Sequence, residues 1–275
     1  MSAFATLTPK DPSERIVSGA AYGLDPRQRL DVYAPDGPKT RRPIVMFFYG
    51  GGWSSGNRTD YGWAARALAS HGYIVVVPDY RLVPAVAYPS FVEDCARATR
   101  WATEHAAQYG GDPKRLFLTG HSAGAYMAMM LALDDQFLTN AGVDFADVRG
   151  AVGLSGPYDF YPFDVKSSQD AFGAFPKPAE TQPIHYAGRP HRPPVLLIQG
   201  DHDKLVGPYN SVNLDSALRA AGNPSDLHLY PGLAHPDTLL ALSVPFRGKA
   251  PILAKVTGFL DEHSQEAGTL TPAAR

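Results

Sequence analysis

The feature that most constrains the fold is a five-residue turn, Gly-His-Ser-Ala-Gly, at residues 120–124. An apolar run at 115–119 comes directly before it, and small and apolar residues follow it at 123–130. This order predicts a strand, a sharp turn and a helix, with Ser122 at the tip of the turn. The flanking glycines are needed because such a turn is too tight for side chains on either side. The serine hydroxyl then stands clear of the backbone, where a base can reach it.

Beyond this turn, strand patterns alternate with helical periodicity along most of the chain. The runs that predict strands lie at 29–35, 43–49, 73–77, 116–118, 151–154, 195–198 and 227–230. The segments that predict helices lie at 61–70, 89–109, 123–133, 209–221 and 252–263. The first run alternates, as in an edge strand, whereas 43–49 is continuous and typical of a strand buried on both faces. The alternation predicts one α/β domain with a mostly parallel central sheet flanked by helices.

Three segments fall outside this alternation. Residues 1–28 are polar and rich in turns, and we expect them to form an N-terminal arm or part of a cap. Residues 156–193 are rich in proline and aromatic residues, and a loop this long is usually a lid or a binding insert. Alternatively, its aromatic side chains only pack the insert onto the body of the domain, and each role can hold for different residues. We expect residues 264–275, which are small and polar, to be disordered.

Composition narrows the class of protein. The net charge is −2 and like charges do not cluster, which argues against nucleic acid or an anionic membrane as a partner. The single cysteine, Cys95, excludes an internal disulfide, fits a reducing compartment and predicts a small core residue on a helix. Residues 1–15 have no long apolar stretch and carry Asp11 and Glu14, so we expect a cytoplasmic location. No segment has the length that a bilayer span needs.

Ser122 needs partners if it is to react. A serine hydroxyl is a weak nucleophile at neutral pH and requires a base, which in turn requires a third group to orient it. Open α/β sheets bind ligands at the carboxyl ends of their strands. Two polar segments follow predicted strands here, one at 199–206 and the other at 231–236. They supply acids and histidines in the chain order serine, acid, histidine, which is expected for a nucleophile on a strand-to-helix turn.

Position alone leaves alternatives for both partners. Asp201 and Asp203 are both in the right place, and either could instead be a turn or helix-cap aspartate. The base could be His235, His202 or His228. His228 lies within an alternating strand and should point to a fixed face, whereas His235 completes the ordered set and is therefore favoured.

A second glycine-rich segment, Tyr-Gly-Gly-Gly-Trp at residues 49–53, directly follows the predicted strand at 44–48. Its glycines let the chain turn so that amide N–H groups face a cavity. Acyl transfer builds negative charge on the carbonyl oxygen, and preorganised amides stabilise that charge. The amide of Ala123 would be a further donor. A phosphate-binding loop is the alternative, but the segment has no Gly-Lys-Ser/Thr and no Gly-x-Gly-x-x-Gly that opens a helix.

Taken together, these motifs resemble those of the α/β-hydrolase superfamily, and within it the hormone-sensitive-lipase-like esterases and related small carboxylesterases. Four stretches carry the resemblance: 49–53 (His-Gly-Gly-Gly-Trp in the family), 77–84 with 88–94 (the Asp-Tyr-Arg-Leu-Ala-Pro segment and its helix), 120–124 (the serine turn), and 200–206 with His235 (the acid and base loops). The similarity covers residues 30–260 and implies an α/β-hydrolase fold with a short lid or cap insert.

The resemblance also implies roles for individual residues. Ser122 would be the nucleophile, His235 the base and Asp203 the orienting acid. The oxyanion would be bound by three backbone amides, those of Gly51, Gly52 and Ala123. The chain departs from the family at Tyr49, which replaces a histidine that braces the oxyanion loop. A tyrosine hydroxyl could brace the loop too, with a different hydrogen-bond geometry.

We therefore interpret the chain as a serine carboxylesterase that forms an acyl-enzyme and needs no metal or organic cofactor. The insert is too short for a long lipid tunnel, so short-chain or aromatic esters are the expected substrates. The candidate pocket residues are five aromatic side chains: Trp53, Tyr80, Phe160, Phe163 and Phe172. A homodimer through an edge strand or the final helix is compatible with the sequence but not demanded by it.

Other functions use the same residues. An arylformamidase that resembles kynurenine formamidase would cleave a formyl amide with the same groups, and feruloyl or acetyl-sugar esterases are further alternatives. A non-catalytic receptor belongs to a different class; plant gibberellin receptors resemble this family and have lost the catalytic histidine. The presence of His235 argues against a receptor here.

Overall fold

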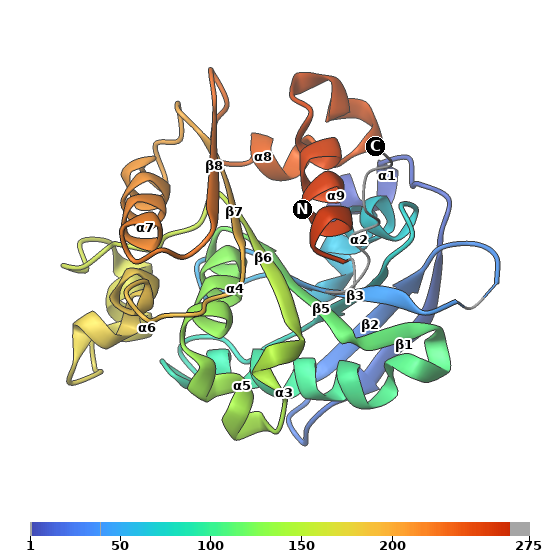
Figure 1. Cartoon of the computed structure of the whole chain (residues 1–275), viewed down its shortest axis with the longest axis horizontal. Helices are drawn as coiled ribbons and strands as arrows, with labels where there is room; N and C mark the ends of the chain where they lie inside the picture. The colour runs from blue at the N-terminus through green and yellow to red at the C-terminus, as the bar shows by residue number, and fades with distance from the viewer. Residues whose placement is uncertain (1, 39, 265–275) are drawn as a thin grey trace, which may run out of the picture.

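The structure is a computed structural model that describes residues 2–38 and 40–264. Within these residues, eight strands form one sheet in the order β1-β2-β4-β3-β5-β6-β7-β8 (Figure 1). The strands are β1 (Glu14–Ala21), β2 (Arg29–Ala34), β3 (Arg42–Phe48), β4 (Ile74–Pro78), β5 (Gly111–His121), β6 (Val148–Leu154), β7 (Val195–Gly200) and β8 (Ser225–Tyr230). Strands β1 and β2 run antiparallel to their neighbours, and the pairs from β4 to β8 are parallel. The predicted mostly parallel sheet is confirmed.

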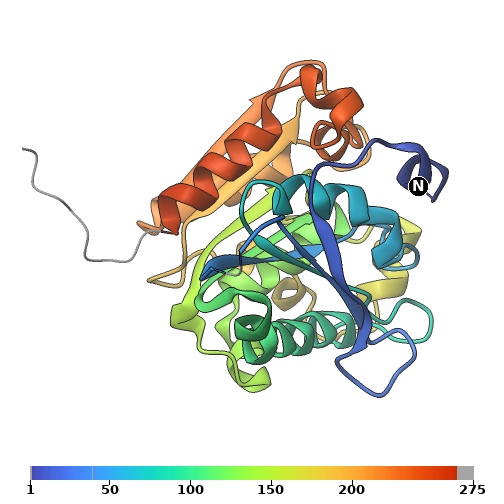
Figure 2. The ribbon, with the colours of Figure 1, turned by 90° about the vertical axis from the view of Figure 1, so that its right-hand side faces the viewer.

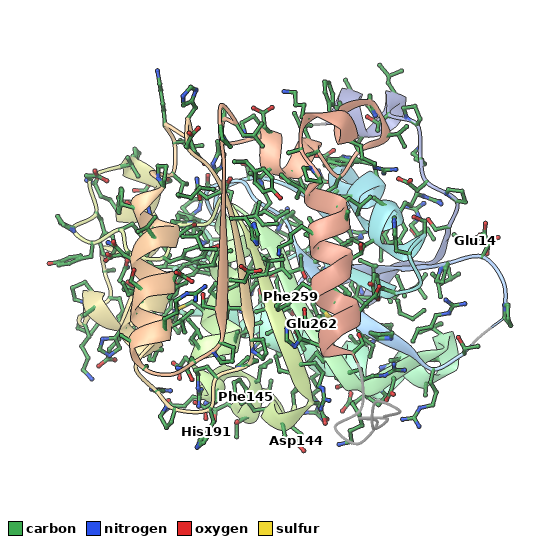
Figure 3. The ribbon with its side chains drawn as sticks, turned by 45° about the horizontal axis from the view of Figure 1, so that its top comes forward. Glu14, Asp144, Phe145, His191, Phe259 and Glu262 are labelled. Carbon is green, nitrogen blue, oxygen red and sulfur yellow. The ribbon has the colours of Figure 1, made fainter. Side chains whose placement is uncertain are left out.

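Helices pack on both faces of this sheet. The α-helices are α1 (Ser2–Leu7), α2 (Gly62–Ala69), α3 (Ser90–His105), α4 (Ala123–Leu133), α5 (Asp135–Ala141), α6 (Lys166–Phe172), α7 (Tyr209–Ala220), α8 (Asp237–Leu240) and α9 (Ile252–His263). Short 3-10 helices lie at Arg58–Tyr61, Ala106–Tyr109, Phe145–Asp147, Pro178–Thr181, Pro183–Tyr186 and Val244–Lys249. Figure 2 shows α3 and α9 on opposite faces of the sheet. On the α9 face, Phe259 packs so closely against β6 that a Cβ added to Gly150 would lie 2.9 Å from its ring (Figure 3).

The inner strands form the centre of the core. The side chains of Ile44–Phe48 in β3 and of Leu116–Leu118 in β5 have no exposed surface. Helix α4 is buried along its whole length, because it packs against the sheet, α3 and α5. Cys95 is a buried residue of α3, as predicted. Among the described residues, no helix combines the length and hydrophobicity needed to cross a bilayer.

Two predictions about the N-terminal part are wrong. Residues 14–21 are not part of a mere arm, because they form β1, which pairs antiparallel with β2. The strand at 29–34 is consequently not at the edge, since it lies between β1 and β4. The alternation of β1 is weak because all its residues are exposed or half-buried and its register shifts twice, between Arg15 and Val17 and between Val17 and Ala20.

The structure also describes the insert at 156–193 and the first residue of the C-terminal segment at 264–275. The insert at 156–193 holds α6 and two 3-10 helices, so it is more ordered than a simple loop. The predicted disordered tail falls on 265–275, outside the described residues, except for Ser264. Ser264 is buried, and its hydroxyl bonds to the carbonyl of Leu260 in α9.

Candidate active site

The turn between β5 and α4 places Ser122 in a strained conformation. Its φ of 56° and ψ of −124° lie outside the regions that residues with a side chain usually adopt. The flanking glycines are required by contact: a Cβ at Gly120 would lie 2.3 Å from the carbonyl of Gly124, and one at Gly124 would lie 1.9 Å from the carbonyl oxygen of Phe48. The amide of Ser122 bonds to the carbonyl of Leu154 across 2.9 Å, which fixes the turn to β6.

Three side chains that are distant in the sequence meet at this turn. The Oγ of Ser122 lies 2.9 Å from Nε2 of His235. The other ring nitrogen of His235, Nδ1, lies 2.8 Å from Oδ2 of Asp203. Since the carboxylate can only accept at that distance, Nδ1 carries the proton and Nε2 is free to accept one from the serine. The geometry is that of a nucleophile, a base and an orienting acid.

Asp203 is held as a carboxylate by its surroundings. Its side chain is buried and accepts hydrogen bonds from the amides of Leu205 and Val206, at 3.0 and 2.9 Å, and from Nε2 of Gln199, at 3.0 Å. Burial opposes ionisation, but the bonds to His235 and to these amides hold the pKa of Asp203 below its usual value. These contacts therefore favour the charged form of Asp203.

The alternatives left by the sequence occupy other places. Asp201 is exposed, and its Oδ1 accepts from the amide of Gly232 across 2.7 Å, as expected of a turn aspartate. His202 is exposed beside Asp201. His228 lies in β8, where Nε2 pairs with Asp226 at 3.0 Å. The structure gives none of these side chains a contact with Ser122.

The glycine-rich segment runs alongside the serine turn. A Cβ added to Gly50 would lie 3.0 Å from both Cβ of Ser122 and the carbonyl oxygen of His121, so the two segments touch. Gly51 and Gly52 have φ values of 135° and 57°, which favour glycine. In the described part of the chain, the hydrogen bonds of turns and loops include none donated by the amides of Gly51, Gly52 or Ala123. Their role as oxyanion donors stays a prediction.

Tyr49, the departure from the family motif, is fully buried at the start of this segment. Its ring stacks between those of Tyr80 and Tyr61, with centroids 4.7 and 5.5 Å away. Its hydroxyl accepts a hydrogen bond from Nη2 of Arg27 across 2.8 Å. Burial and then the charge of Asp79 raise the pKa of Tyr49 well above its usual value, so the hydroxyl stays neutral. Tyrosine can therefore brace this loop.

Two residues at this site, Arg27 and His121, were not predicted from the sequence. Arg27 lies in the segment interpreted as an arm, and nothing in the local pattern marks it. His121 precedes Ser122 in the motif, and this adjacency was the one available signal. His121 is buried, and its Nε2 donates to the carbonyl of His235 across 3.1 Å. Burial and then the charge of His235 lower the pKa of His121 to about 3.

The predicted aromatic pocket residues divide into two groups. Trp53 and Phe172 are almost fully buried, whereas Phe160 and Phe163 are half-buried. The ring of Phe160 stacks on Trp53 at 5.8 Å, and that of Phe163 stacks on Phe172 at 5.7 Å. The inner rings therefore pack the insert onto the body of the domain, and the outer rings keep some exposed surface. That this surface binds a ligand stays a prediction.

Tyr80 does not fit its predicted role as a pocket residue. Its side chain has no exposed surface, and its hydroxyl donates to the carbonyl of Tyr49 across 2.8 Å. It lies behind the glycine-rich loop, which it supports, and cannot touch a ligand there. The sequence could not show this, because an aromatic residue near a strand end is equally suited to either side of a loop.

Helix α6 of the insert covers the glycine-rich loop. A Cβ added to Gly52 would lie 3.6 Å from Cβ of Ser167, so the helix and the loop are in contact. A surface groove of about 630 Å³ runs beside them, lined by Ser54, residues 83–87, Lys166 and Asp170.

The architecture and the serine turn now identify the class of protein. A mostly parallel sheet that carries a strained serine directly after an inner strand, with the acid and the histidine on later loops, defines an α/β-hydrolase. The chain belongs to the BD-FAE family, whose model matches residues 30–218.

Curated relatives are similar over most of the chain. The isoprenylcysteine alpha-carbonyl methylesterase ICME of Arabidopsis thaliana is 28% identical over 256 residues, which cover 86% of this chain and 60% of that protein. Esterase LipC of Mycobacterium tuberculosis is 29% identical over 240 residues, which cover 80% of this chain and 59% of that protein. The chain thus spans about 60% of the length of these relatives.

Solved structures share the fold. An inhibited esterase B from Lactobacillus rhamnosis superposes with a TM-score of 0.81 at 22% identity, over 96% of this chain and 93% of that one. The butyrate-bound esterase 2 from Thermogutta terrifontis superposes with a TM-score of 0.74 at 23% identity, over 94% and 96% of the two chains. At these identities the likeness establishes the α/β-hydrolase fold.

Proposed function

We propose that the protein is a serine carboxylesterase. The observation that carries the proposal is the pair of hydrogen bonds, 2.9 and 2.8 Å long, that connect Ser122 through His235 to Asp203. As His235 takes the hydroxyl proton on Nε2, the oxygen of Ser122 attacks the ester carbonyl carbon. The buried carboxylate of Asp203 keeps the imidazole in the required tautomer and stabilises its positive charge.

The remaining steps use the same groups. The tetrahedral oxyanion is bound by the amides of Gly51, Gly52 and Ala123; the glycine-rich loop touches the serine turn at Gly50, and Ala123 directly follows the serine. The carbon–oxygen bond to the alcohol breaks, and the leaving alkoxide takes the proton from His235. Water then attacks the acyl-enzyme while His235 accepts its proton, and the serine oxygen recovers that proton as the acid leaves. No step requires a metal or an organic cofactor.

The substrate class we propose is short-chain or aromatic esters. The half-buried rings of Phe160 and Phe163 offer a modest apolar surface next to Trp53. The names of the relatives support ester hydrolysis, since they include a methylesterase and a general esterase. A small-molecule ester is then the principal partner. The homodimer and the cytoplasmic location stay predictions.

Side-by-side hydrolysis of p-nitrophenyl acetate, p-nitrophenyl octanoate and N-formylkynurenine tests this proposal. We expect turnover of the acetate to exceed that of the other two compounds. A strong preference for N-formylkynurenine would instead make the protein an arylformamidase. A fluorophosphonate probe should label the wild type but not Ser122→Ala, because only an activated serine attacks it. Equal labelling of the two proteins would exclude Ser122 as the nucleophile.

A further inference from the structure

The guanidinium group of Arg27 connects three points around the glycine-rich loop. Its Nη2 donates to the hydroxyl of Tyr49 across 2.8 Å and to the carbonyl of Gly56 across 2.9 Å. Its Nε donates to the carbonyl of Tyr80 across 2.9 Å. Tyr49 and Gly56 are the two ends of the loop that contains Gly51 and Gly52. One side chain therefore ties both ends of this loop to the chain that leaves β4.

In the middle of the loop, the ring of Trp53 is buried and its carbonyl accepts from the amide of Val83 across 2.9 Å, but the two glycines before it have no side chains that could make contacts. The positive φ values of Gly51 and Gly52 are conformations that glycine can leave easily. Within the loop, the amides of Ser54 and Ser55 bond to the carbonyl of Gly51 at 3.2 and 3.1 Å, which closes a local turn. These bonds lie inside the loop. Arg27 adds side-chain bonds at both of its ends, to Tyr49 and Gly56.

The bonds of Arg27 are directional and go mainly to neutral acceptors. Its nearest carboxylate, Asp79, is 4.0 Å away and is bonded more closely to Arg58. Arg27 itself is fixed by its own turn, since its amide donates to Oδ1 of Asp25 across 2.8 Å. A planar guanidinium offers several N–H donors in a rigid arrangement, which a lysine ammonium cannot reproduce.

We propose that Arg27 is a positioning residue that holds the oxyanion loop through Tyr49 and Gly56. The inference rests on the proposed esterase function. Arg27 precedes the part of the chain that matches the family model, so this anchor comes from the N-terminal segment. Its loss should displace the loop amides from the developing oxyanion. The loop amides bind the oxyanion of the transition state more strongly than the carbonyl oxygen of the bound ester. Displacing them should therefore lower kcat more than it raises KM.

The test compares Arg27→Met, Arg27→Lys and Tyr49→Phe with a matched control, Arg247→Met, on p-nitrophenyl acetate. Arg247 is exposed to a similar degree, 35% against 36% for Arg27, and makes three hydrogen bonds to residues outside the loop, Asp11 and Leu242. We expect Arg27→Met to lower kcat about tenfold to a hundredfold, with KM within about twofold of the wild type. This decrease in kcat does not exceed the roughly hundredfold to thousandfold decrease expected when a direct oxyanion donor is lost. Arg27→Lys should recover only part of the loss.

Two further readouts separate positioning from general damage. Tyr49→Phe keeps the stacked ring and removes only the acceptor, so it should lower kcat in the same direction, and the double variant should lose less than the product of the single losses. The acid limb of the kcat/KM profile should stay at the wild-type pH in each variant, because the base is untouched. The rate of fluorophosphonate labelling should fall with kcat, since that reaction also places charge on an oxygen in the loop.

The outcomes are distinct. The proposed role of Arg27 would be overturned by any of three results: an unchanged kcat in Arg27→Met, a rise in KM without a fall in kcat, or an equal fall in kcat in Arg247→Met. The proposed esterase function would still stand. A wild type that hydrolyses none of the esters and does not react with the probe would overturn the proposed function, and the anchor with it.

Discussion

The imidazole of His121 donates a hydrogen bond from Nε2 to the backbone carbonyl of His235 across 3.1 Å. His121 directly precedes Ser122, so this bond ties the turn that carries the serine to the loop that carries the histidine. The two rings lie 4.9 Å apart, and His121 is buried. A neutral His121 avoids a second positive charge next to His235 when that residue takes up a proton.

The first prediction is that acid destabilises the fold through His121. Its pKa is lowered from 6.5 to about 3, so below pH 6.5 the unfolded chain binds a proton that the folded chain does not. The free energy of unfolding should therefore fall as the pH is lowered from 6.5 towards 3, with a contribution from His121 of up to about 1.4 kcal/mol per pH unit. Urea unfolding at a series of pH values measures this slope.

His121→Gln is the control for this effect, because its amide can donate to the same carbonyl but does not titrate. Between pH 6.5 and 4.5 the slope should be smaller in the variant than in the wild type. The lowered pKa of Asp203 also stabilises the fold. This stabilisation is fully present above pH 3.8, the usual pKa of the carboxyl, and is lost as the pH falls through the lower pKa of the folded state. Asp203 therefore contributes to the slope below the window of pH 6.5 to 4.5. Identical slopes in the two proteins would rule out His121 as the source.

The second prediction concerns the choice of base. His235→Ala should reduce kcat on p-nitrophenyl acetate by about four to six orders of magnitude, because the serine loses its proton acceptor. His202→Ala should stay within about threefold of the wild type, since the structure leaves this side chain exposed and gives it no contact with Ser122. Circular dichroism checks that both variants are folded. The reverse pattern of activities would show that the wrong histidine was chosen.

The third prediction separates the two aspartates. Asp203→Asn should lower kcat about ten-thousandfold, because the amide can present a donor to Nδ1 and favour the wrong tautomer of His235. Asp201→Asn should cost less than about tenfold, since its carboxylate accepts from the amide of Gly232 in a loop and lies beside the exposed His202 rather than His235. Steady-state kinetics of the two variants decide the matter. Comparable losses would mean that Asp201 also acts on the base.

The fourth prediction concerns acyl-chain preference. Phe163 is half-buried against Phe160 and Phe172, so Phe163→Ala should open space for longer acyl groups. We expect the ratio of kcat/KM for p-nitrophenyl octanoate to that for the acetate to rise roughly tenfold. Phe175→Ala is the matched control, because Phe175 belongs to the same insert but packs on Tyr88. An unchanged ratio in Phe163→Ala would remove this ring from the acyl pocket.

Local patterns predicted the elements well where they were strong. The apolar runs of β3 and β5 and the helix at 123–133 lie where their periodicity placed them, because burial on both faces leaves a continuous apolar signal. Strand β1 was not predicted, because its residues are exposed or half-buried and its register is shifted, so the sequence shows no regular apolar pattern there. The neighbours of β2 were also missed, since strand order depends on contacts between distant segments.

The candidate site shows the same division. The motif singled out Ser122, whereas position left two aspartates and three histidines as candidates; the ordered set favoured His235, and the family resemblance favoured Asp203 over Asp201. Two residues of separation change the direction in which a side chain points, and only the folded loop shows that Asp203 is turned towards the base. Tyr80 was misplaced because the sequence does not record which side of a loop faces a ligand.

The sequence alone determined the α/β order of elements, the glycines that tight turns require and the types of residue that could react. Each of these depends on neighbours within a few positions, so the chain carries it locally. The tertiary structure alone decided which carboxylate meets His235, how Arg27 reaches Tyr49 and where His121 makes its bond. Ser122 and His235 are 113 residues apart, and only the packing of the whole sheet and its helices brings their side chains within 2.9 Å.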